Sequence, residues 1–137
     1  MLIHKTSLRV RYADTDQMQY AYNGKYFEYF EVGRTEMMRE QGLTYKKIED
    51  SGYQMPVYEA FIQFKNPAFY DELLEVETRV EKFPQAKVHI DHTIRSLERN
   101  IVVVEGYIEL AFIKSDTKKI TRAPEFFTKA LKKFFND

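Results

Sequence analysis

The sequence contains no cysteine among its 137 residues. This absence excludes disulfide bonds, thiolate catalysis and cysteine-ligated metals, and it fits a reducing compartment. No apolar run approaches the length of a transmembrane helix, and the N-terminal stretch MLIHKTSLRVRY lacks the apolar core of a signal peptide. We therefore expect a soluble, cytoplasmic protein that does not engage a membrane.

The chain also lacks an excess of charge of either sign. Its 21 basic residues balance 21 acidic residues, and the formal net charge is +0 at pH 7. A neutral chain has no general electrostatic attraction for nucleic acid or for an anionic surface. It also has little repulsion between its own copies, which is compatible with self-association.

Glycine and proline are scarce, with 5 and 4 occurrences. We find no repeat, low-complexity tract or linker-like run, and the length suits one domain. The sequence therefore predicts a single domain over residues 1–137. Its 44% hydrophobic and 15% aromatic content is enough to build a core.

Hydrophobic periodicity distinguishes strands from helices along the chain. SLRVRY at residues 7–12 alternates as a half-buried strand does. KYFEYFEVGRTEMMREQG at 25–42 has helical spacing, with Asn23 as the expected N-cap and Gly42 as the expected left-handed C-terminal cap. Gly33 weakens such a helix by about 1 kcal/mol relative to alanine, so we expect a close packing neighbour there.

The second half of the chain alternates in the β pattern. We expect a short helix at 43–52, strands at 57–64, 73–83, 87–97 and 101–114, and a terminal helix starting at Pro124. Consecutive strands after one helix predict an α+β fold with an antiparallel sheet packed on the long aromatic helix. The edge of such a sheet needs cover, which a second copy can supply.

Two aspartates lie in the polar break before the long helix. Asp14 and Asp16 in RYADTDQMQYAYNG are either turn residues that bond to the local backbone or groups that perform chemistry. The local pattern leaves both interpretations open.

The wider context of these aspartates resembles a known family. The run RYADTDQMQYAYNGKYFEYFEVGRTEMMREQGL at 11–43, followed by NPAFYDELLEVETRV and RAPEFF, is similar to hotdog-fold acyl-CoA thioesterases of the 4-hydroxybenzoyl-CoA thioesterase and YbgC-like branch. The resemblance spans roughly residues 5 to 130. It implies an antiparallel sheet wrapped around one long central helix, two protomers that join their sheets side by side in a homodimer or homotetramer, and active sites at the interface between protomers.

The resemblance also implies an activity and catalytic residues. It implies hydrolysis of acyl-CoA to free acid and CoA, with Asp16 as the catalytic carboxylate and the backbone N–H of Asn23 polarising the thioester carbonyl. A helix N-terminus suits developing negative charge, and Asp16 acts either as general base or as nucleophile. No cofactor or metal is required. Some relatives have histidine where this chain has Asn23, so imidazole chemistry is absent at that position.

Further substrate contacts are expected on both sides of this site. Tyr12 and Tyr22 are candidates for the acyl pocket, together with Gly24 at the start of the helix, and CoA phosphates would need cations. The candidate cations are Lys87, Lys118, Lys119 and Arg122. Where relatives can have a basic pair, this chain has Gln85 and Ala86.

The histidines do not form a metal site in this interpretation. His89 and His92 have opposite strand parity and point to opposite faces of the sheet. We expect His92 to be a hydrogen-bonded core residue and His89 to be solvated.

Two alternative functions remain open. One is hydrolysis of acyl-carrier-protein thioesters by the same fold, which a basic patch near the cleft would favour. The other is a hotdog domain that binds a ligand or partner without turnover. The sequence does not determine the acyl preference.

Overall fold

The computed structural model describes residues 1–135. Its strands are β1 (Leu2–Arg9), β2 (Tyr53–Gln54), β3 (Val57–Phe64), β4 (Leu73–Val80), β5 (Lys87–Ser96), β6 (Ile101–Ala111) and β7 (Ile113–Lys114). Its helices are α1 (Lys25–Glu40), α2 (Tyr45–Asp50) and α3 (Glu125–Leu131), and short 3-10 turns cover Tyr12–Asp14 and Lys132–Phe134. Among the described residues, no helix is both long and apolar enough to cross a membrane.

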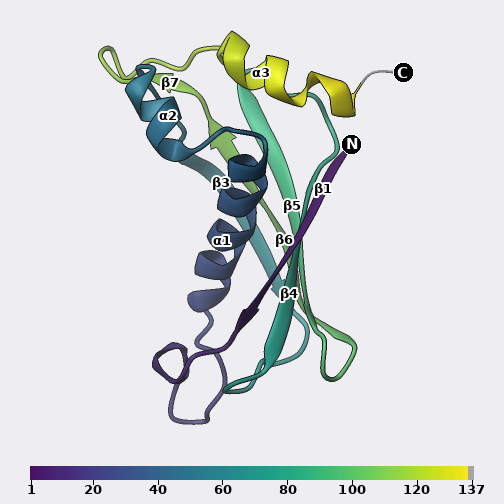
Figure 1. The fold of residues 1–137 in the computed structure, drawn as a ribbon. Coiled ribbons are helices and arrows are strands. Elements are labelled where there is room, and N and C mark those ends of the chain that lie inside the picture. Colours follow the sequence, from purple (N-terminus) through teal and green to yellow (C-terminus); the bar gives the residue numbers. More distant parts are fainter. Residues whose placement is uncertain (136–137) are drawn as a thin grey trace.

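The main sheet has five strands in the order β1-β4-β5-β6-β3, and every neighbouring pair is antiparallel. Figure 1 shows α1 lying along one face of this sheet, with α2 and α3 at the end that holds the N-terminus. The predicted α+β fold, an antiparallel sheet around one long helix, is confirmed.

Alternation along β4 and β5 builds the core between the sheet and α1. Alternate side chains of both strands are buried and face the helix, so each strand contributes one apolar face. Gly33 lies where α1 comes closest to β4, and a Cβ on this glycine would stand 2.6 Å from Thr78 Oγ1 and 2.6 Å from Val76 Cγ1. The close packing expected at Gly33 is therefore present.

The first strand differs from its prediction. It covers Leu2–Arg9 rather than residues 7–12. Val10 leaves the ladder to bond with the loop before β4, with its N–H 3.1 Å from Glu72 O. The Tyr12–Asp14 turn follows directly. The apolar–polar alternation of the sequence extends beyond Arg9, where the strand ends, because Val10 is buried although it no longer pairs with β4.

The start of α1 also differs from expectation. The N-cap residue is Gly24 rather than Asn23, and no side chain caps this end. The chain already turns at Tyr22, whose carbonyl accepts a hydrogen bond from the Lys25 N–H at 2.8 Å. At the other end Gly42 has φ +74°, as its predicted capping role requires.

Strand β3 forms one edge of the sheet and is exposed on both faces. Within it only Ile62 is even partly buried, although the alternation at 57–64 predicted one buried face. Four large apolar side chains of this strand are at least 49% exposed: Val57, Tyr58, Phe61 and Phe64. The reason is position: β3 is an edge strand and the main contacts of α1 are with β1, β4 and β5, although Tyr26 of α1 packs against Phe64 at the end of β3.

Candidate active site

Asp16 lies in the loop between β1 and α1. Its Oδ1 accepts a hydrogen bond from the Met18 N–H at 2.9 Å, and its own N–H donates to the Tyr20 carbonyl at 2.9 Å. The carboxylate remains exposed. Asp16 is therefore a turn former whose carboxylate still reaches solvent, so the two sequence interpretations are compatible at this residue.

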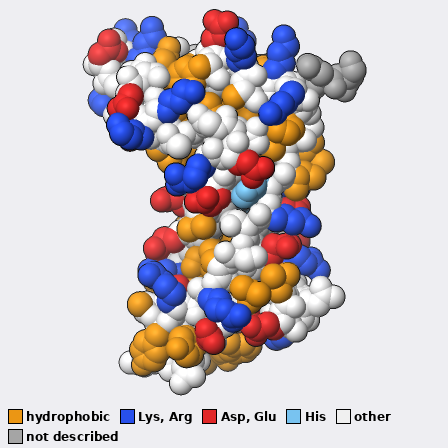
Figure 2. Space-filling view, in the orientation of Figure 1, with side chains coloured by type: hydrophobic (Ala, Val, Ile, Leu, Met, Phe, Trp, Pro, Cys, Tyr) orange, Lys and Arg blue, Asp and Glu red, His pale blue; other side chains and the backbone are white. Residues whose placement is uncertain are grey.

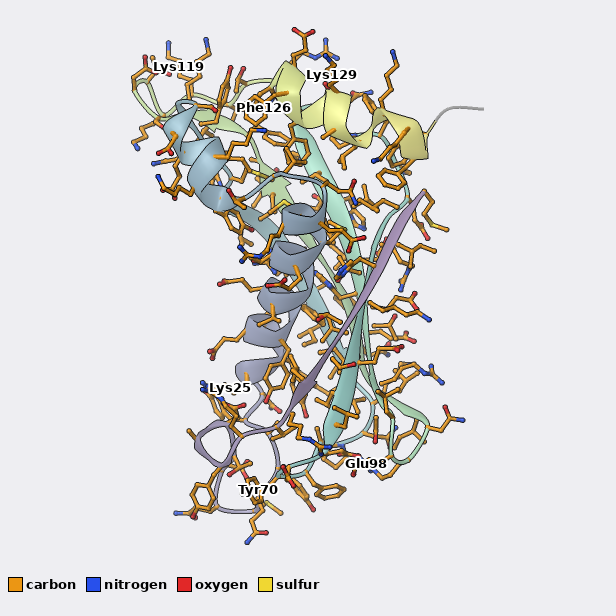
Figure 3. All side chains as sticks on the ribbon, viewed as in Figure 1. Lys25, Tyr70, Glu98, Lys119, Phe126 and Lys129 are labelled. Atoms are coloured by element: carbon orange, nitrogen blue, oxygen red, sulfur yellow. The ribbon has the colours of Figure 1, made fainter. Side chains whose placement is uncertain are left out.

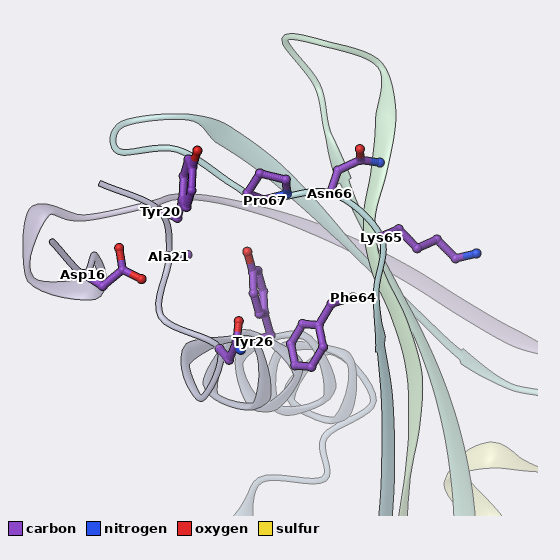
Figure 4. Close-up of a pocket in the computed structure, with 9 residues that line it drawn as sticks. Asp16, Tyr20, Ala21, Tyr26, Phe64, Lys65, Asn66 and Pro67 are labelled. Atoms are coloured by element: carbon purple, nitrogen blue, oxygen red, sulfur yellow. The ribbon is translucent and has the colours of Figure 1, made fainter. Parts of the chain in front are cut away.

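The carboxylate of Asp16 borders a cleft of about 220 Å³. Figure 4 shows its walls, which come from the Asp16 loop, the first turn of α1, and the end of β3 with the loop after it. The lining residues are Asp16, Tyr20, Ala21, Asn23, Tyr26, Phe64, Lys65, Asn66 and Pro67. The structure thus brings together the two predicted catalytic positions, Asp16 and Asn23.

The backbone at the start of α1 supplies unused donors to this region. Among residues 1–135, the N–H groups of Asn23 and Gly24 donate to no other backbone group. Free N–H groups and the positive end of the helix dipole coincide here. The predicted role of Asn23 depends on its N–H, so the loss of its capping role does not affect it.

Asp14 performs a different role from its neighbour. It is buried, and it accepts hydrogen bonds from the Tyr29 hydroxyl at 2.8 Å and from the Arg11 backbone and guanidinium at 3.1 Å each. Burial alone would raise the pKa of Asp14, but these hydrogen bonds outweigh burial and hold the pKa below its usual value. Asp14 therefore anchors the loop to α1.

An ion pair between the buried Glu72 and the more exposed Arg99 fixes the loop that forms the opposite wall. Arg99 donates to Glu72 through Nε at 2.6 Å and through Nη2 at 2.9 Å, and Ser96 also donates to Glu72. Burial opposes ionisation, yet the bonds from Arg99 and Ser96 keep the pKa of Glu72 lowered. Our sequence reasoning missed this cluster because its members are far apart along the chain.

The sequence also did not identify most of the residues that line the cleft. Tyr26, Phe64, Lys65 and Asn66 were predicted only as members of elements or not at all. Helical spacing assigned Tyr26 to the core, and it is 2% exposed, yet it borders the cleft. Its place in the first helical turn, ten residues after Asp16, was the available signal.

The predicted tyrosines lie outside the cleft. Tyr12 is 77% exposed and packs edge-on against Tyr70, with ring centroids 5.7 Å apart. Tyr22 is 61% exposed and lies beside Gly24. Figure 3 places Tyr70 at the bottom of the molecule, and Figure 2 shows apolar side chains gathered at that end. Within one chain, neither tyrosine lines the space beside Asp16.

The predicted cations lie away from Asp16. Lys87 stands over the Tyr58 ring at 4.0 Å, at the beginning of β5, and Lys118 bonds to Gln54 at 3.2 Å. Arg122 lines a separate hollow near α3. Figure 3 shows Lys119 at the opposite end of the molecule from Lys25, the first residue of α1. One chain alone therefore does not place these cations beside the cleft.

The structure corrects the expectation for His89 and confirms the one for His92 only in part. His92 is fully buried, stacks on Phe30 at 4.5 Å and shares a 3.2 Å hydrogen bond with Thr78, but its Nε2 has no partner among the described residues. His89 is bonded to Glu109 at 2.8 Å and to Asp91 at 3.2 Å rather than simply solvated. Within residues 1–135, no group of three or more His, Cys, Asp or Glu side chains is arranged so that it could hold a metal ion.

Comparison with known families identifies the group to which this architecture is similar. A model described as the thioesterase-like superfamily matches residues 10–131. The chain is 27% identical over 130 residues to the acyl-CoA thioesterase YbgC of Haemophilus influenzae, covering 94% of this chain and 91% of that protein.

Solved structures agree with this match. The chain is similar to a DHNA-CoA thioesterase from Staphylococcus aureus, with a TM-score of 0.86, 31% identity, and coverage of 100% of this chain and 97% of the other. A 1,4-dihydroxy-2-naphthoyl-CoA thioesterase from Synechocystis shares the fold, with a TM-score of 0.89, 18% identity, and coverage of 98% and 99%.

Proposed function

The chain belongs to the thioesterase-like superfamily, and we propose that it hydrolyses acyl-CoA thioesters to a free acid and CoA. The observation that carries this proposal is a single cleft lined by the exposed carboxylate of Asp16 and by Asn23 at the start of α1. Relatives named as acyl-CoA thioesterases support the choice of substrate.

The geometry suits attack on a thioester carbonyl. As the carbonyl carbon becomes tetrahedral, negative charge develops on its oxygen. The unused N–H groups of Asn23 and Gly24 can stabilise this oxygen by donating hydrogen bonds to it. A well-placed donor of this kind contributes about 3 to 4 kcal/mol to the transition state. Asp16 either takes a proton from the attacking water or attacks the carbonyl itself. The thiolate departs without needing strong acid assistance.

We propose that the active unit is a homodimer or a larger homo-oligomer built on β3. The open edge of β3 carries unpaired backbone groups and exposed apolar side chains, and pairing with a second β3 would satisfy both. The opposite edge strand, β1, is a poorer candidate because its alternate residues are already partly covered by α1. Phe64 and Lys65 at the end of β3 also line the cleft.

Such pairing gives the predicted cations a route to substrate. If two β3 strands pair antiparallel, the Val57 end of one strand lies alongside the Phe64 end of the other. Lys87, which stands over Tyr58 near that first end, would then approach the partner's cleft. We propose that CoA phosphates are bound across this interface, with Lys118, Lys119 and Arg122 as further candidates.

Release of free thiol from a panel of acyl-CoAs tests the proposal. We expect the wild type to release thiol, and Asp16→Ala to lower kcat by about 10²- to 10⁴-fold, the usual contribution of a general base. Asp50→Ala on α2 removes a carboxylate whose one side-chain partner among residues 1–135 is Lys46, and it serves as the matched control. Unchanged turnover in Asp16→Ala would exclude Asp16 from catalysis.

The alternative functions give different results in the same assay. A carrier-protein thioesterase would cleave acyl-carrier protein far faster than acyl-CoA. A ligand-binding domain would bind acyl-CoA, as measured by calorimetry, without releasing thiol from any member of the panel. Varying chain length and aromatic character in the panel then defines the acyl preference.

A further inference from the structure

Tyr26 is a polar side chain almost completely buried in the wall of the cleft. It is 2% exposed, yet it borders the same space as Asp16 and Asn23. Its ring packs against Phe64 at 5.8 Å and against Tyr29 at 5.9 Å. Figure 4 shows its hydroxyl reaching up from α1 into the gap between Ala21 and Pro67.

The hydroxyl of Tyr26 accepts one hydrogen bond but donates none to the described residues. The Ala68 N–H donates to Tyr26 Oη at 3.2 Å. That is the one hydrogen bond its hydroxyl makes within residues 1–135. The phenol proton therefore has no acceptor in the described part of the chain, although a buried hydroxyl normally has one. An acceptor supplied by a ligand would complete this group.

The loop that holds Tyr26 is itself fixed. The Ala68 carbonyl accepts a hydrogen bond from the Ala21 N–H at 2.8 Å, so one residue ties the loop after β3 to both the Asp16 loop and α1. Tyr20 and Phe69 pack across the same junction, with ring centroids 5.2 Å apart. The ring and oxygen of Tyr26 are thus held in place before substrate arrives, as preorganised stabilisation requires.

The direction of the side chain places it with the free backbone donors. Side chains on a helix point back toward its N-terminus. Tyr26 is the second residue of α1, so its ring projects past the helix start, where the unused N–H groups of Asn23 and Gly24 lie. The Tyr26 hydroxyl and these N–H groups therefore belong to the same end of α1, and Tyr26, Asn23 and Asp16 all border one cleft.

We propose that Tyr26 is a further catalytic residue, whose hydroxyl donates a hydrogen bond to the carbonyl oxygen of the bound thioester and to the oxyanion formed from it. This proposal rests on the proposed thioesterase function of the same cleft. The step forms no covalent bond to Tyr26 and transfers no proton, because the phenol donates throughout and the displaced sulfur leaves as thiolate.

The surroundings keep this phenol protonated. Burial raises the pKa of Tyr26, the Ala68 N–H opposes that rise, and the nearby carboxylates of Glu72 and Asp16 add to it, while Arg99 counteracts them. A neutral phenol is the form that donates. The hydroxyl is therefore available as a donor across the physiological pH range.

The first test compares Tyr26→Phe with the wild type. Phenylalanine keeps the ring and its packing but removes the donor. We expect kcat to fall about 10²-fold while KM rises no more than about tenfold, the value of one neutral hydrogen bond to the ground-state carbonyl, and the same loss for every acyl group tested. Tyr53→Phe, which alters a tyrosine packed on Phe126 outside the cleft, is the matched control. A kcat within about twofold of wild type overturns the proposal.

A second test needs no turnover, so it separates this proposal from the proposed function. A ketone analogue of acyl-CoA, with CH₂ in place of the sulfur, keeps the carbonyl oxygen, and a thioether analogue lacks it. We expect Tyr26→Phe to bind the ketone about three- to tenfold more weakly than wild type, the value of one neutral hydrogen bond, and the thioether equally well. Equal loss for both analogues indicates a purely structural role and overturns the proposal.

A third measurement covers the case in which Tyr26→Phe unfolds. Replacing Tyr26 with a fluorinated tyrosine keeps the hydroxyl and its bond to Ala68 N–H but lowers the pKa of the phenol. If the phenol must donate, kcat falls at a lower pH than in the wild type, by the difference between the two phenol pKa values. An unshifted alkaline limb overturns the proposal.

Discussion

At the scale of single residues, Asp14 and Asp16 show how position separates two chemically identical side chains. Both belong to the same short loop, but Asp14 turns inward to Tyr29 and Arg11, whereas Asp16 turns toward the cleft. Local sequence identified both as candidates. The resemblance to a known family points to Asp16 as the catalytic carboxylate, and this role stays a prediction. The structure shows that Asp14 is occupied by hydrogen bonds from Tyr29 and Arg11.

The buried hydrogen bonds of Asp14 predict its effect on stability. We expect Asp14→Ala to lower the free energy of unfolding by about 1 to 3 kcal/mol, because the Tyr29 hydroxyl loses its buried acceptor. Because the folded-state pKa is lowered, the stabilisation is present above the unfolded pKa and disappears as pH falls through the folded pKa. Urea unfolding at neutral and strongly acidic pH should show the difference between variant and wild type shrink. A difference of equal size at both pH values contradicts the assignment.

His92 predicts acid sensitivity in a different pH window. Burial, with the charges of Arg34 and Arg79, lowers the pKa of His92 to about 3 from 6.5. The unfolded chain therefore binds a proton that the native state does not. His92 by itself is therefore expected to lower the free energy of unfolding by up to about 1.4 kcal/mol per pH unit between the unfolded pKa and the folded pKa of about 3. We expect His92→Phe, which keeps a ring against Phe30, to reduce this slope in denaturant titrations between pH 6 and pH 4.

A variant at His89 is the control for the His92 experiment, because it should change the pH dependence of stability in the opposite direction. Burial lowers the pKa of His89, but the hydrogen bond to Glu109 and the charge of Asp91 outweigh burial and raise it. A raised pKa contributes stability below the unfolded value, and this contribution is lost as pH rises. We therefore expect His89→Gln to steepen the loss of stability on acidification. Slope changes of the same sign in both variants would contradict these assignments.

At the scale of elements, the contact between α1 and β4 depends on a missing side chain. Gly33 costs the helix about 1 kcal/mol relative to alanine, but a Cβ there would stand 2.6 Å from both Thr78 and Val76 side chains. We expect Gly33→Ala to destabilise the protein by about 1 to 3 kcal/mol, because overpacking outweighs the gain in helix propensity. Thermal unfolding followed by circular dichroism measures this.

A neighbouring position on the same helix supplies the comparison for Gly33. Thr35 is only partly buried, and alanine has the higher helix propensity. Thr35→Ala should leave stability equal or slightly raised. If Gly33→Ala were also neutral or stabilising, α1 would not be held against β4 as closely as described.

At the scale of the whole molecule, the open edge of β3 predicts association. We expect the wild type to be a dimer or larger oligomer by light scattering, and Phe61→Lys, on an exposed apolar position of β3, to shift it toward monomer. Ile3→Lys changes a similarly exposed residue on the opposite edge strand, β1, and should leave the oligomer intact. A monomeric wild type would refute the interface.

The cytoplasmic location stays a prediction. So do the roles of Lys87, Lys118, Lys119 and Arg122, because they depend on how two chains meet. Loss of activity together with loss of the oligomer in Phe61→Lys would connect the interface with the site.

Local sequence patterns by themselves determined several elements of this protein. Period-two alternation at 73–83 and 87–97 and helical spacing at 25–42 predict β4, β5 and α1, since each element buries one face whatever its neighbours are. The polar break at Asp14 and Asp16, followed directly by the long helix, likewise predicts a carboxylate near a helix N-terminus. These features arise from periodicity and from short separations along the chain.

Only the tertiary structure decided which groups share the cleft. Strand order β1-β4-β5-β6-β3 leaves β3 at an open edge and brings its end, Phe64–Pro67, beside Tyr26 and the Asp16 loop. Alternation could not show that both faces of β3 stay exposed, because an edge strand and an inner strand can have the same pattern. The hydrogen bonding of Tyr26 was equally beyond local prediction. Its hydroxyl accepts from the Ala68 N–H, 42 residues away along the chain, and no local sequence pattern relates these two residues.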